Sequence, residues 1–259
     1  MPELPAAEAM RRRVEAGALH RTITGATVTD LGPMHMPSAA ELERLTGTRF
    51  TAARRYGKYV FIGSASGPWL VISLGMTGTI RTYDESEGAP DHAKLTVTFE
   101  GERRLAYICP RKFGDTYLAE SPEAFVAEHG LGPDALEVSR EDFIARLSPS
   151  KTAVKTAMID QNRIAGIGNL WSDEALYRVG LRPDVPANTL KDNSLGALHA
   201  AIRDILTEAI DAGDPPDFPE DWLATRRKPG AACGRCEGTI EKKTIGGRSA
   251  YFCPTHQAA

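Results

Sequence analysis

Cys233-Gly-Arg-Cys236 and Cys253-Pro-Thr-His256 are the two stretches that set the fold of the C-terminal part of the chain. Their spacing is C-x2-C-x16-C-x2-H, in which each short pair presents two ligands from one tight turn. Two such turns facing each other close a tetrahedron around Zn²⁺, and a set of three Cys and one His leaves no open position for catalysis. We therefore expect one structural zinc ion held by Cys233, Cys236, Cys253 and His256. The alternative is a chance cluster of thiols, with His256 a polar residue of the tail.

The stretch between the two ligand pairs predicts a β-hairpin. Residues 239–245 and 249–252 are rich in strand-forming side chains, and Gly246-Gly247 lies between them as a turn. Between residues 225 and 256, seven Lys and Arg residues stand against two Glu residues, in a chain whose formal net charge is −3. Such a basic, zinc-stapled hairpin is suited to binding phosphates. A solvated ribbon without a partner is the alternative.

The composition of the chain is that of an ordinary globular protein, with 42% apolar and 25% charged residues over 259 positions. That length favours two or three modules. The net negative charge does not exclude nucleic-acid binding, which depends on local patches. The acidic, proline-containing start is unlike a signal peptide, and no run of about 18 apolar residues predicts a membrane span. Four cysteines favour a reducing, cytoplasmic location over a disulfide scaffold.

The first half of the chain predicts one helix followed by many short strands. Residues 6–17 are dominated by Ala, Met, Arg and Glu, and Gly17 is a natural stop for a helix. β-branched and aromatic runs then alternate with Gly, Pro, Asp and Ser, which indicates an antiparallel sandwich or barrel. The expected strands are residues 22–29, 50–54, 59–63, 69–74, 79–83, 94–99, 104–108 and 115–118.

After Leu118 the spacing of apolar residues becomes helical. Leu198, Ile202, Leu206 and Ile210 recur every four residues and predict one buried stripe. Residues 213–221 are acidic and proline-rich, so they cannot continue that helix and form a loop. The expected helices are residues 122–128, 139–147, 151–160, 170–179, 189–194 and 196–212.

The first three residues, Met1-Pro2-Glu3, are candidates for chemistry. The small Pro2 favours removal of Met1, which leaves a free secondary amine beside a carboxylic acid. An α-amine has an ordinary pKa of about 8, so a useful fraction is unprotonated at neutral pH. Amines attack sugar aldehydes and form Schiff bases. The alternative is an ordinary frayed terminus.

Further candidates lie in glycine-rich turns. The run Ala-Gly-Ile-Gly-Asn ends at Asn169, which we expect to be the N-cap of a helix whose N-terminus binds phosphate. Met76 on one turn, with Arg111 and Phe113 on another, predicts an exposed wedge of the kind that unstacks DNA bases. Lys58 is a candidate phosphate contact. The alternatives are a structural turn, core residues and a solvated lysine, respectively.

Taken together and in order, these motifs resemble the formamidopyrimidine-DNA glycosylase/endonuclease VIII family, and they lean toward its formamidopyrimidine branch. The resemblance covers nearly the whole chain. The matching stretches are Pro-Glu-Leu-Pro at residues 2–5, Arg-Arg-Tyr-Gly-Lys-Tyr at 54–59, Leu-Gly-Met-Thr-Gly at 74–78, Pro-Arg-Lys-Phe-Gly at 110–114, Ile-Asp-Gln at 159–161, Ala-Gly-Ile-Gly-Asn at 165–169, and the terminal zinc finger.

The resemblance implies an α+β, multidomain protein. Its expected parts are an N-terminal catalytic β-sandwich domain with an N-terminal helix (residues 1–125), an interdomain linker (126–138), a helix-two-turn-helix DNA-binding domain (139–225) and a zinc-finger hairpin (226–259). The expected partner is double-stranded DNA with a damaged base or an abasic site, bound by a monomer in the bacterial cytoplasm, with no membrane involved.

The resemblance also implies roles for single residues. Pro2 is the nucleophile on C1′ of the damaged nucleotide, and Glu3 is its acid/base partner. Lys58, Arg248 and Asn169 hold phosphates beside the lesion. Of these three, Lys58 and Arg248 also belong to the catalytic residues, and Asn169 to the DNA-binding residues. Met76, Arg111 and Phe113 fill the void left by the extruded base, and Lys155 adds a polar contact. The implied reaction is base excision followed by strand cleavage through β,δ-elimination.

Three departures from the family pattern keep alternatives open. Ala6 stands where the family usually carries Glu, and His256 stands where it carries the last zinc-binding Cys. Residues 213–225 are shorter than the family's loop that closes over an extruded oxidised purine. The substrate can therefore be a lesion other than 8-oxoguanine, or abasic sites only. A non-catalytic or lyase-only damage-binding protein with the family fold is the main alternative to the glycosylase. An unrelated zinc-ribbon protein is a further one.

Overall fold

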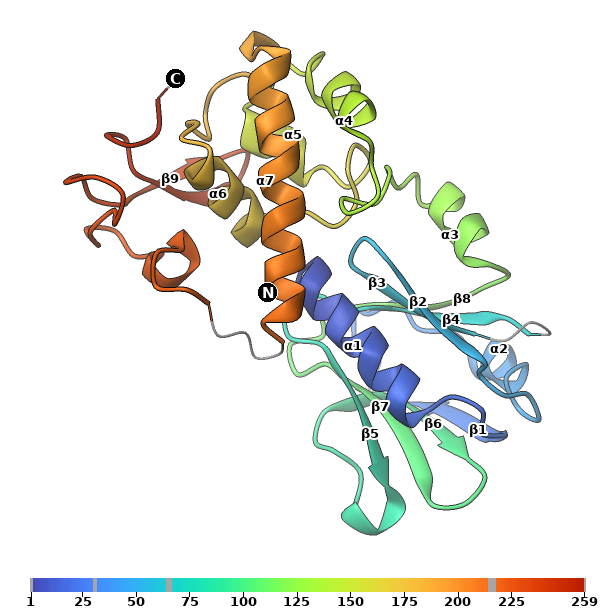
Figure 1. Ribbon diagram of the computed structural model, residues 1–259. Helices are drawn as coiled ribbons and strands as arrows, with labels where there is room; N and C mark the ends of the chain where they lie inside the picture. Colours follow the sequence, from blue (N-terminus) through green and yellow to red (C-terminus); the bar gives the residue numbers. More distant parts are fainter. Residues whose placement is uncertain (1, 30–31, 64–66, 214–217, 259) are drawn as a thin grey trace. The chain divides into compact units, whose positions relative to one another are not determined.

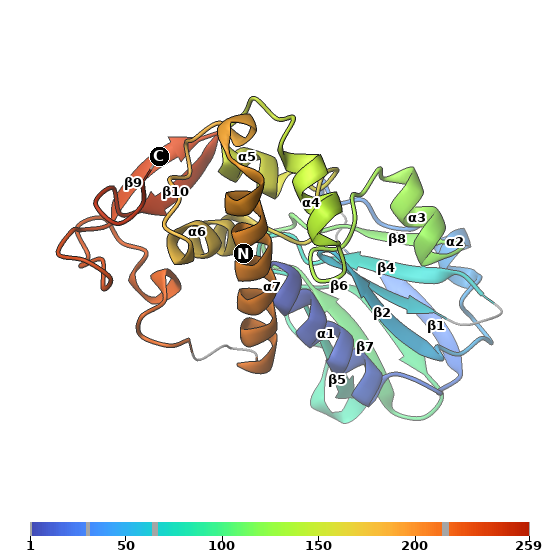
Figure 2. The same ribbon diagram turned by 45° about the horizontal axis from the view of Figure 1, so that its top comes forward.

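The computed structural model describes residues 2–29, 32–63, 67–213 and 218–258. The chain divides into two compact units, Met1–Gly130 and Leu131–Ala259. Figures 1 and 2 show strands and a long N-terminal helix in the first unit, and mostly helices with one hairpin in the second. In the described ranges, no helix combines the length and apolar character that a membrane span needs.

Two antiparallel sheets form the first unit. One has the strand order β1-β6-β7-β5 and the other the order β2-β3-β4-β8. One apolar cluster takes Ile62 and Leu70 from the second sheet and Val97 and Leu105 from the first, so the sheets share a core. The predicted β-sandwich is therefore confirmed. The strands are β1 (Ile23–Val28), β2 (Ala52–Tyr56), β3 (Tyr59–Gly63), β4 (Trp69–Ser73), β5 (Thr79–Asp84), β6 (Ala93–Phe99), β7 (Arg103–Ile108) and β8 (Thr116–Ala119).

Helix α1 (Leu4–Gly17) covers part of this core. Its buried residues are Leu4, Ala7, Met10 and Val14, spaced three or four apart, so they form one apolar stripe. The stripe packs against β2, β3 and β5. Burying such side chains contributes about 1.5–3 kcal/mol for each large one. The helix starts two residues earlier than the predicted 6–17, because proline is tolerated in a first helical turn.

Short helices complete the first unit. Helix α2 (Ala39–Glu43) was not expected, although its signal is in the sequence. Ser38 Oγ accepts from Glu41 N at 3.3 Å, and Glu41 Oε2 accepts from Ser38 N at 2.8 Å, which is a capping box. The 3₁₀ turn η1 (Glu85–Glu87) follows β5. Helix α3 (Pro122–Glu128) is confirmed at both ends, with Ser121 as its N-cap.

The second unit is mainly helical. Its elements are α4 (Arg140–Leu147), α5 (Val154–Ile159), α6 (Asn169–Arg178), the 3₁₀ turn η2 (Ala187–Thr189), α7 (Asp192–Asp211), the 3₁₀ turn η3 (Leu223–Arg226), and strands β9 (Glu241–Ile245) and β10 (Arg248–Phe252). The separate helix predicted at 189–194 is wrong. Leu190 and Lys191 have extended backbone angles, so one helix of 20 residues begins at Asp192 instead of at 196.

The predicted hairpin is confirmed. Strands β9 and β10 pair antiparallel, and Ile245 faces Arg248 across the turn. Gly246 and Gly247 occupy that turn with φ angles of 54° and 75°, which glycine adopts without a steric penalty. An isolated two-stranded ribbon is marginal in water, so this one depends on what it packs against.

Two loops of the first unit touch through their backbones. A Cβ atom added to Gly75, whose φ is +58°, would lie 2.3 Å from the carbonyl oxygen of Phe113. One added to Gly114 would lie 2.4 Å from the carbonyl oxygen of Ser73. Glycine at both positions therefore lets the loop after β4 and the loop after β7 lie side by side.

We predict that Gly75→Ala lowers the free energy of unfolding by about 1–2 kcal/mol for the positive φ and by about 1–3 kcal/mol more for the clash with the facing loop. Gly101→Ala is the matched control. Gly101 has a φ of +81° but nothing within 4 Å of an added Cβ, so only the first cost applies. Urea unfolding of both variants measures the difference. Equal losses would show that the two loops do not constrain each other.

Candidate functional site

The candidate residues fall into two groups, one in each unit. In the first unit, Pro2 precedes α1 and Glu3 is the N-cap residue of that helix. Glu3 is only 3% exposed, which is rare for a carboxyl-bearing residue. Its carbonyl oxygen accepts from Ala7 N at 3.1 Å, so the helix fixes the backbone next to Pro2. Met1, whose removal the sequence predicts, lies outside the described residues.

The neighbouring carboxylate on α1 is already engaged. Glu8 accepts from Arg11 Nη2 at 2.9 Å and from Arg12 Nε at 3.0 Å, and Arg55 Nε lies 3.7 Å away. Burial acts to raise the pKa of Glu8, but these arginines lower it overall. Glu8 is therefore ionised and held by cations. Residue 6 is alanine and packs against the apolar core, so the helix start has no carboxylate at that position either.

Lys58 lies in the turn that joins β2 to β3. Gly57 has a φ of +54° in this turn, and its carbonyl oxygen accepts from Arg55 Nη1 at 3.2 Å. Arg55 also pairs with Glu8, which is about 9 Å along the helix from Pro2 at 1.5 Å per residue. The fold thus brings the Lys58 turn toward the start of α1.

The three predicted wedge residues lie together on the two touching loops. Met76 is 37% exposed and Phe113 is 57% exposed, so the alternative that they are core residues is excluded. The guanidinium of Arg111 lies 5.4 Å from the ring centroid of Phe113, within range of a cation–π contact. Arg111 N donates to Thr77 Oγ1 at 3.4 Å, which ties one loop to the other.

In the second unit, Asn169 is the first residue of α6, and Gly168 rather than Asn169 is the N-cap. The predicted cap is therefore wrong. The Oδ1 atom of Asn169 is buried and has no hydrogen-bond partner among the described residues. The turn before it is held by Gln161, whose Nε2 donates to Ile159 O at 2.7 Å and Ile167 O at 2.9 Å.

Lys155 is not on the surface. Its side chain and that of Asp173 are completely buried, and its Nζ donates to Asp173 Oδ1. Burial raises the pKa of Asp173, and the adjacent Lys155 and Arg227 oppose that effect. Sequence reasoning missed Asp173, although an acidic pair, Asp173-Glu174, between Trp171 and the apolar pair Ala175-Leu176 was a signal.

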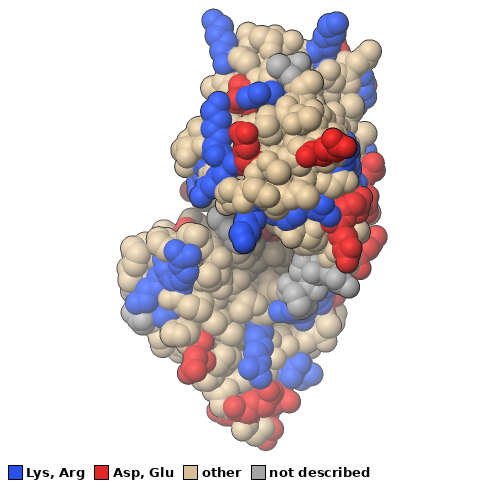
Figure 3. Space-filling model, turned by 90° about the vertical axis from the view of Figure 1, so that its left-hand side faces the viewer, with Lys and Arg blue, Asp and Glu red and all other residues tan. Residues whose placement is uncertain are grey.

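Arg248 begins β10, directly after the glycine turn, and its side chain is exposed. The turn packs on α5, because a Cβ added to Gly246 would lie 2.4 Å from Thr156 Oγ1. Figure 3 shows Lys and Arg side chains interspersed with Asp and Glu on the visible face of each unit, in keeping with the small net charge. Arg248 is an exposed cation at the start of β10, and the turn that precedes it packs against α5.

The segment before the zinc finger is anchored to α6. Phe218 and Trp222 stack with ring centroids 5.3 Å apart, and the Trp171 ring packs against both at interplanar angles of 87° and 89°. Glu174 Oε2 accepts from Ala224 N at 2.9 Å. Residues 214–217, part of the loop predicted at 213–221, lie outside the described ranges. From Phe218 onward the segment is packed in place.

Cys233, Cys236 and Cys253 meet at the base of the hairpin. Their three Sγ atoms lie within 4.8 Å of one another, with Cys236 and Cys253 at 3.6 Å. Cys233 and Cys253 are buried against Tyr177, Leu223 and Ile240. Three gathered thiols suit Zn²⁺, which prefers tetrahedral sulfur and imidazole ligands. The predicted single structural zinc ion is therefore supported.

His256 is not part of that group of ligand atoms. Its Nε2 lies 2.9 Å from the carbonyl oxygen of Tyr177, an oxygen that can only accept. Nε2 therefore carries the proton, which leaves Nδ1 with a lone pair. A histidine that binds a metal typically donates its other ring N–H to a carbonyl in this way. His256 as the fourth ligand stays a prediction.

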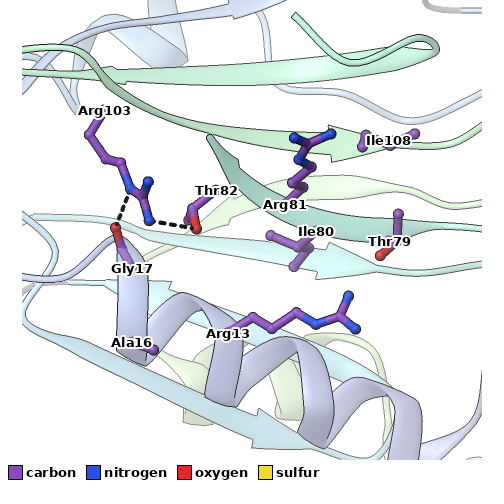
Figure 4. Close-up of a pocket in the computed structure, with 9 residues that line it drawn as sticks. All are labelled: Arg13, Ala16, Gly17, Thr79, Ile80, Arg81, Thr82, Arg103 and Ile108. Carbon is purple, nitrogen blue, oxygen red and sulfur yellow. Dashed lines mark hydrogen bonds between the residues drawn. The ribbon is translucent and has the colours of Figure 1, made fainter. Parts of the chain in front are cut away.

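A cavity of about 490 Å³ lies between the C-terminal part of α1 and strands β5 and β7 (Figure 4). It is lined by Arg13, Ala16, Gly17, Thr79, Ile80, Arg81, Thr82, Arg103 and Ile108. Arg103 donates from Nε to Gly17 O at 3.3 Å and from Nη2 to Thr82 Oγ1 at 3.2 Å, and Arg81 pairs with Glu87. It lies at the far end of α1, about 15–20 Å from Pro2 at 1.5 Å per residue, so it is outside the N-terminal site.

For the zinc site we predict that His256→Ala keeps the metal but weakens its affinity by at least about 10-fold. The Co²⁺-substituted protein would lose the visible absorption of a ligand set with three sulfurs and one nitrogen, and gain that of a set with water in the fourth position. Thr255→Ala, an exposed neighbour, is the control and should match the unchanged protein. Unchanged spectra and affinity in His256→Ala would exclude His256 as a ligand.

Comparison with known proteins gives three family matches along the chain. Residues 1–116 match the formamidopyrimidine-DNA glycosylase N-terminal domain, and residues 130–215 match the H2TH domain of the same enzymes. Residues 230–255 match the zinc finger found in FPG and IleRS. The three matched families therefore follow one another along the chain. The first match lies in the first unit, and the second and third lie in the second unit.

Whole-chain relatives agree with these matches. Formamidopyrimidine-DNA glycosylase of Chloroflexus aurantiacus is 32% identical over 99% of this chain and 98% of its own length. The enzyme of Geobacter metallireducens is 32% identical over 99% of this chain and all of its own length. Lactococcus lactis Fpg bound non-covalently to abasic-site DNA superposes with a TM-score of 0.86 at 26% identity, covering 99% of this chain and 100% of that one. The chain belongs to the formamidopyrimidine-DNA glycosylase family.

Proposed function

We propose that this protein excises damaged bases and then cleaves the DNA strand, with the amine of Pro2 as the nucleophile. Family membership carries the coarser statement: the chain is a DNA glycosylase of base excision repair. The observation that carries the finer one is Glu3, a carboxyl residue 3% exposed, held by the first turn of a rigid helix next to Pro2.

In the proposed reaction the lone pair of Pro2 attacks C1′ of the damaged nucleotide. The glycosidic bond breaks, and its electron pair leaves with the base. Glu3 donates a proton to the sugar O4′, the ring opens, and a Schiff base links Pro2 to C1′. Loss of a C2′ proton then expels the 3′ phosphate, and loss of a C4′ proton expels the 5′ phosphate. A carboxyl group is one of the side chains that enzymes use for such a proton transfer.

The remaining candidates, which lie in both units, support a DNA-binding role. Lys58 and Arg248 supply positive charge for phosphates, and Asn169, the first residue of α6, carries a side-chain N–H donor. Met76, Arg111 and Phe113 form the exposed wedge, which suits the space left by an extruded base. The zinc finger supports the hairpin that carries Arg248. We infer that the protein works as a monomer on chromosomal DNA in the bacterial cytoplasm.

The lesion that suits this chain best is a ring-opened purine. Its relatives are named for formamidopyrimidine, and a solved Lactococcus lactis relative, 27% identical with a TM-score of 0.87, holds Fapy-dG DNA. Another solved relative, MutM, holds DNA with carbocyclic 8-oxo-G. In this chain, residues 213–225 are shorter than the loop with which the family closes over an extruded oxidised purine, and Phe218 packs against Trp171. We therefore propose weaker excision of 8-oxoguanine than of formamidopyrimidine.

A second candidate function is supported by Ala6. The side chain packs against the core and supplies no carboxylate near the sugar, which favours a lyase that acts only on existing abasic sites. Duplexes with Fapy-dG and with a pre-formed abasic site separate the two. Cleavage of the abasic site alone would establish the lyase-only function.

To test the nucleophile, the protein is incubated with abasic-site duplex and borohydride, and the cross-linked peptide is mapped by mass spectrometry. The expected cross-link is at Pro2, because reduction traps the Schiff base at the attacking amine. Pro2→Gly should lower the trapped fraction. Tight DNA binding with no cross-link, or a cross-link at a lysine, would rule out the proposed role of Pro2.

Glu3→Gln separates the two chemical steps. Amide nitrogen and oxygen cannot donate the proton as a carboxyl does, so base excision should slow by about 10²–10⁴-fold. Cleavage of a pre-formed abasic site should fall much less, because its aldehyde already accepts the amine. Glu15→Gln, at an exposed position on the same helix, is the control and should leave both rates unchanged. Equal losses in both steps would contradict the acid role.

A further inference from the structure

One buried carboxyl in the second unit joins the elements that carry two of the proposed phosphate contacts. Asp173 lies in α6, one turn after Asn169. Its Oδ1 accepts from Lys155 Nζ. Its Oδ2 accepts from Arg227 Nη2 at 2.7 Å and from the backbone N of Tyr251, in β10, at 3.1 Å. Helix α5, helix α6, the segment before the finger and the hairpin therefore all meet at this side chain.

Lys155 extends the same junction. Its Nζ also donates to the carbonyl oxygen of Ser249 at 3.0 Å and to that of Asn169 at 3.4 Å. Ser249 directly follows Arg248, and Asn169 begins α6. The ammonium group thus bridges the backbones at the two proposed contact positions.

Arg227 closes the junction from the outside. Its guanidinium lies 4.6 Å from the ring centroid of Tyr251, and its Nη2 lies 3.5 Å from the carbonyl oxygen of Asn169. The same two elements, α6 and β10, are therefore linked a second time. Two cations share one carboxylate, so the junction stays positive where the DNA backbone is expected.

These bonds leave Lys155 no proton for DNA. An ammonium group has three N–H donors, and three acceptors lie within hydrogen-bonding distance of Nζ. The side chain is also completely buried. Contact with a phosphate would require breaking the pair with Asp173, which leaves a buried charge uncompensated. The direct DNA contact that the resemblance implies for Lys155 is therefore not supported.

We propose that Asp173 is a positioning residue that, with Lys155 and Arg227, sets the separation between the N-terminal turn of α6 and strand β10. That separation lets Asn169 and Arg248 reach the DNA backbone at the same time. Asp173 touches no DNA itself and acts through these two residues. The inference rests on the proposed function, which assigns the phosphate contacts to Asn169 and Arg248.

The test measures binding to a duplex with a tetrahydrofuran abasic-site analogue over a range of salt concentrations, for Asp173→Asn, Arg248→Ala and the double variant. Each lost phosphate contact lowers the slope of log K against log salt by about 0.9. Asp173→Asn should lower the slope as much as Arg248→Ala does. The double variant should fall no further, because both changes remove the same contact.

Asp204→Asn is the matched control. Asp204 is exposed on α7, so the variant makes the same change in net charge without touching the junction. Its slope should equal that of the unchanged protein. An unchanged slope for Asp173→Asn, or full additivity with Arg248→Ala, would overturn the proposal.

A second variant covers the chance that Asp173→Asn fails to fold with Lys155 left unpaired. Lys155→Met combined with Asp173→Leu removes both buried charges at similar volume, a change that buried pairs often tolerate. Thermal melting and the zinc-to-protein ratio verify folding. The slope of log K against log salt for this double variant should stay below that of the unchanged protein, because no carboxylate accepts from Tyr251 N and Arg227. A wild-type slope would mean that Asp173 only neutralises Lys155, which overturns the proposal.

The two proposals fail separately. The binding slopes require no chemistry, whereas borohydride trapping at saturating DNA reports the Pro2 amine. Trapping at Pro2 should persist in Asp173→Asn once the DNA concentration is raised. Absent trapping in the unchanged protein, with slopes as expected, would remove the lyase proposal and leave the positioning role intact.

Discussion

The second unit depends on the buried ion pair between Lys155 and Asp173. Removing one partner of such a pair typically costs about 3–5 kcal/mol, because the other charge is left without compensation. The pair also fixes the position of β10, because Asp173 accepts from the backbone of Tyr251 and Lys155 donates to the backbone of Ser249. A two-stranded ribbon has too little core to hold its own position. The junction at Asp173 and the three gathered cysteines supply what the ribbon lacks.

The first unit solves a different problem, which is how to hold a chain terminus still. The apolar stripe of α1 packs on the sandwich, and the resulting rigid helix start holds Glu3 and the backbone beside Pro2. A free N-terminus would otherwise sample many positions and lose that freedom anew in each reaction. The contacts between the two touching loops likewise hold Met76 and Phe113 in place. Large apolar side chains are kept exposed at a fixed place instead of collapsing into the core.

Both units place exposed side chains by means of hydrogen bonds of the neighbouring backbone. Arg248 is exposed beside Ser249, whose carbonyl binds a buried lysine. Arg111 is exposed beside a backbone that binds Thr77. The proposed reactive and binding side chains are therefore few, and contacts of the neighbouring backbone hold their positions. This division explains how a chain with a net charge of −3 presents basic groups to an anionic partner.

Local patterns were enough to predict the strand-rich first half, most helix positions, the glycine turn of the hairpin and the three clustered cysteines. Period-two and helical spacing, glycine and cysteine carry that information within short stretches. The patterns did not reveal α2, the merged helix α7, the cap at Gly168 or the burial of Lys155. Lysine and aspartate eighteen positions apart give no local sign that they will pair. That pairing arises only in the folded chain, because it takes packing of α5 against α6 and the hairpin to exclude water from both charges.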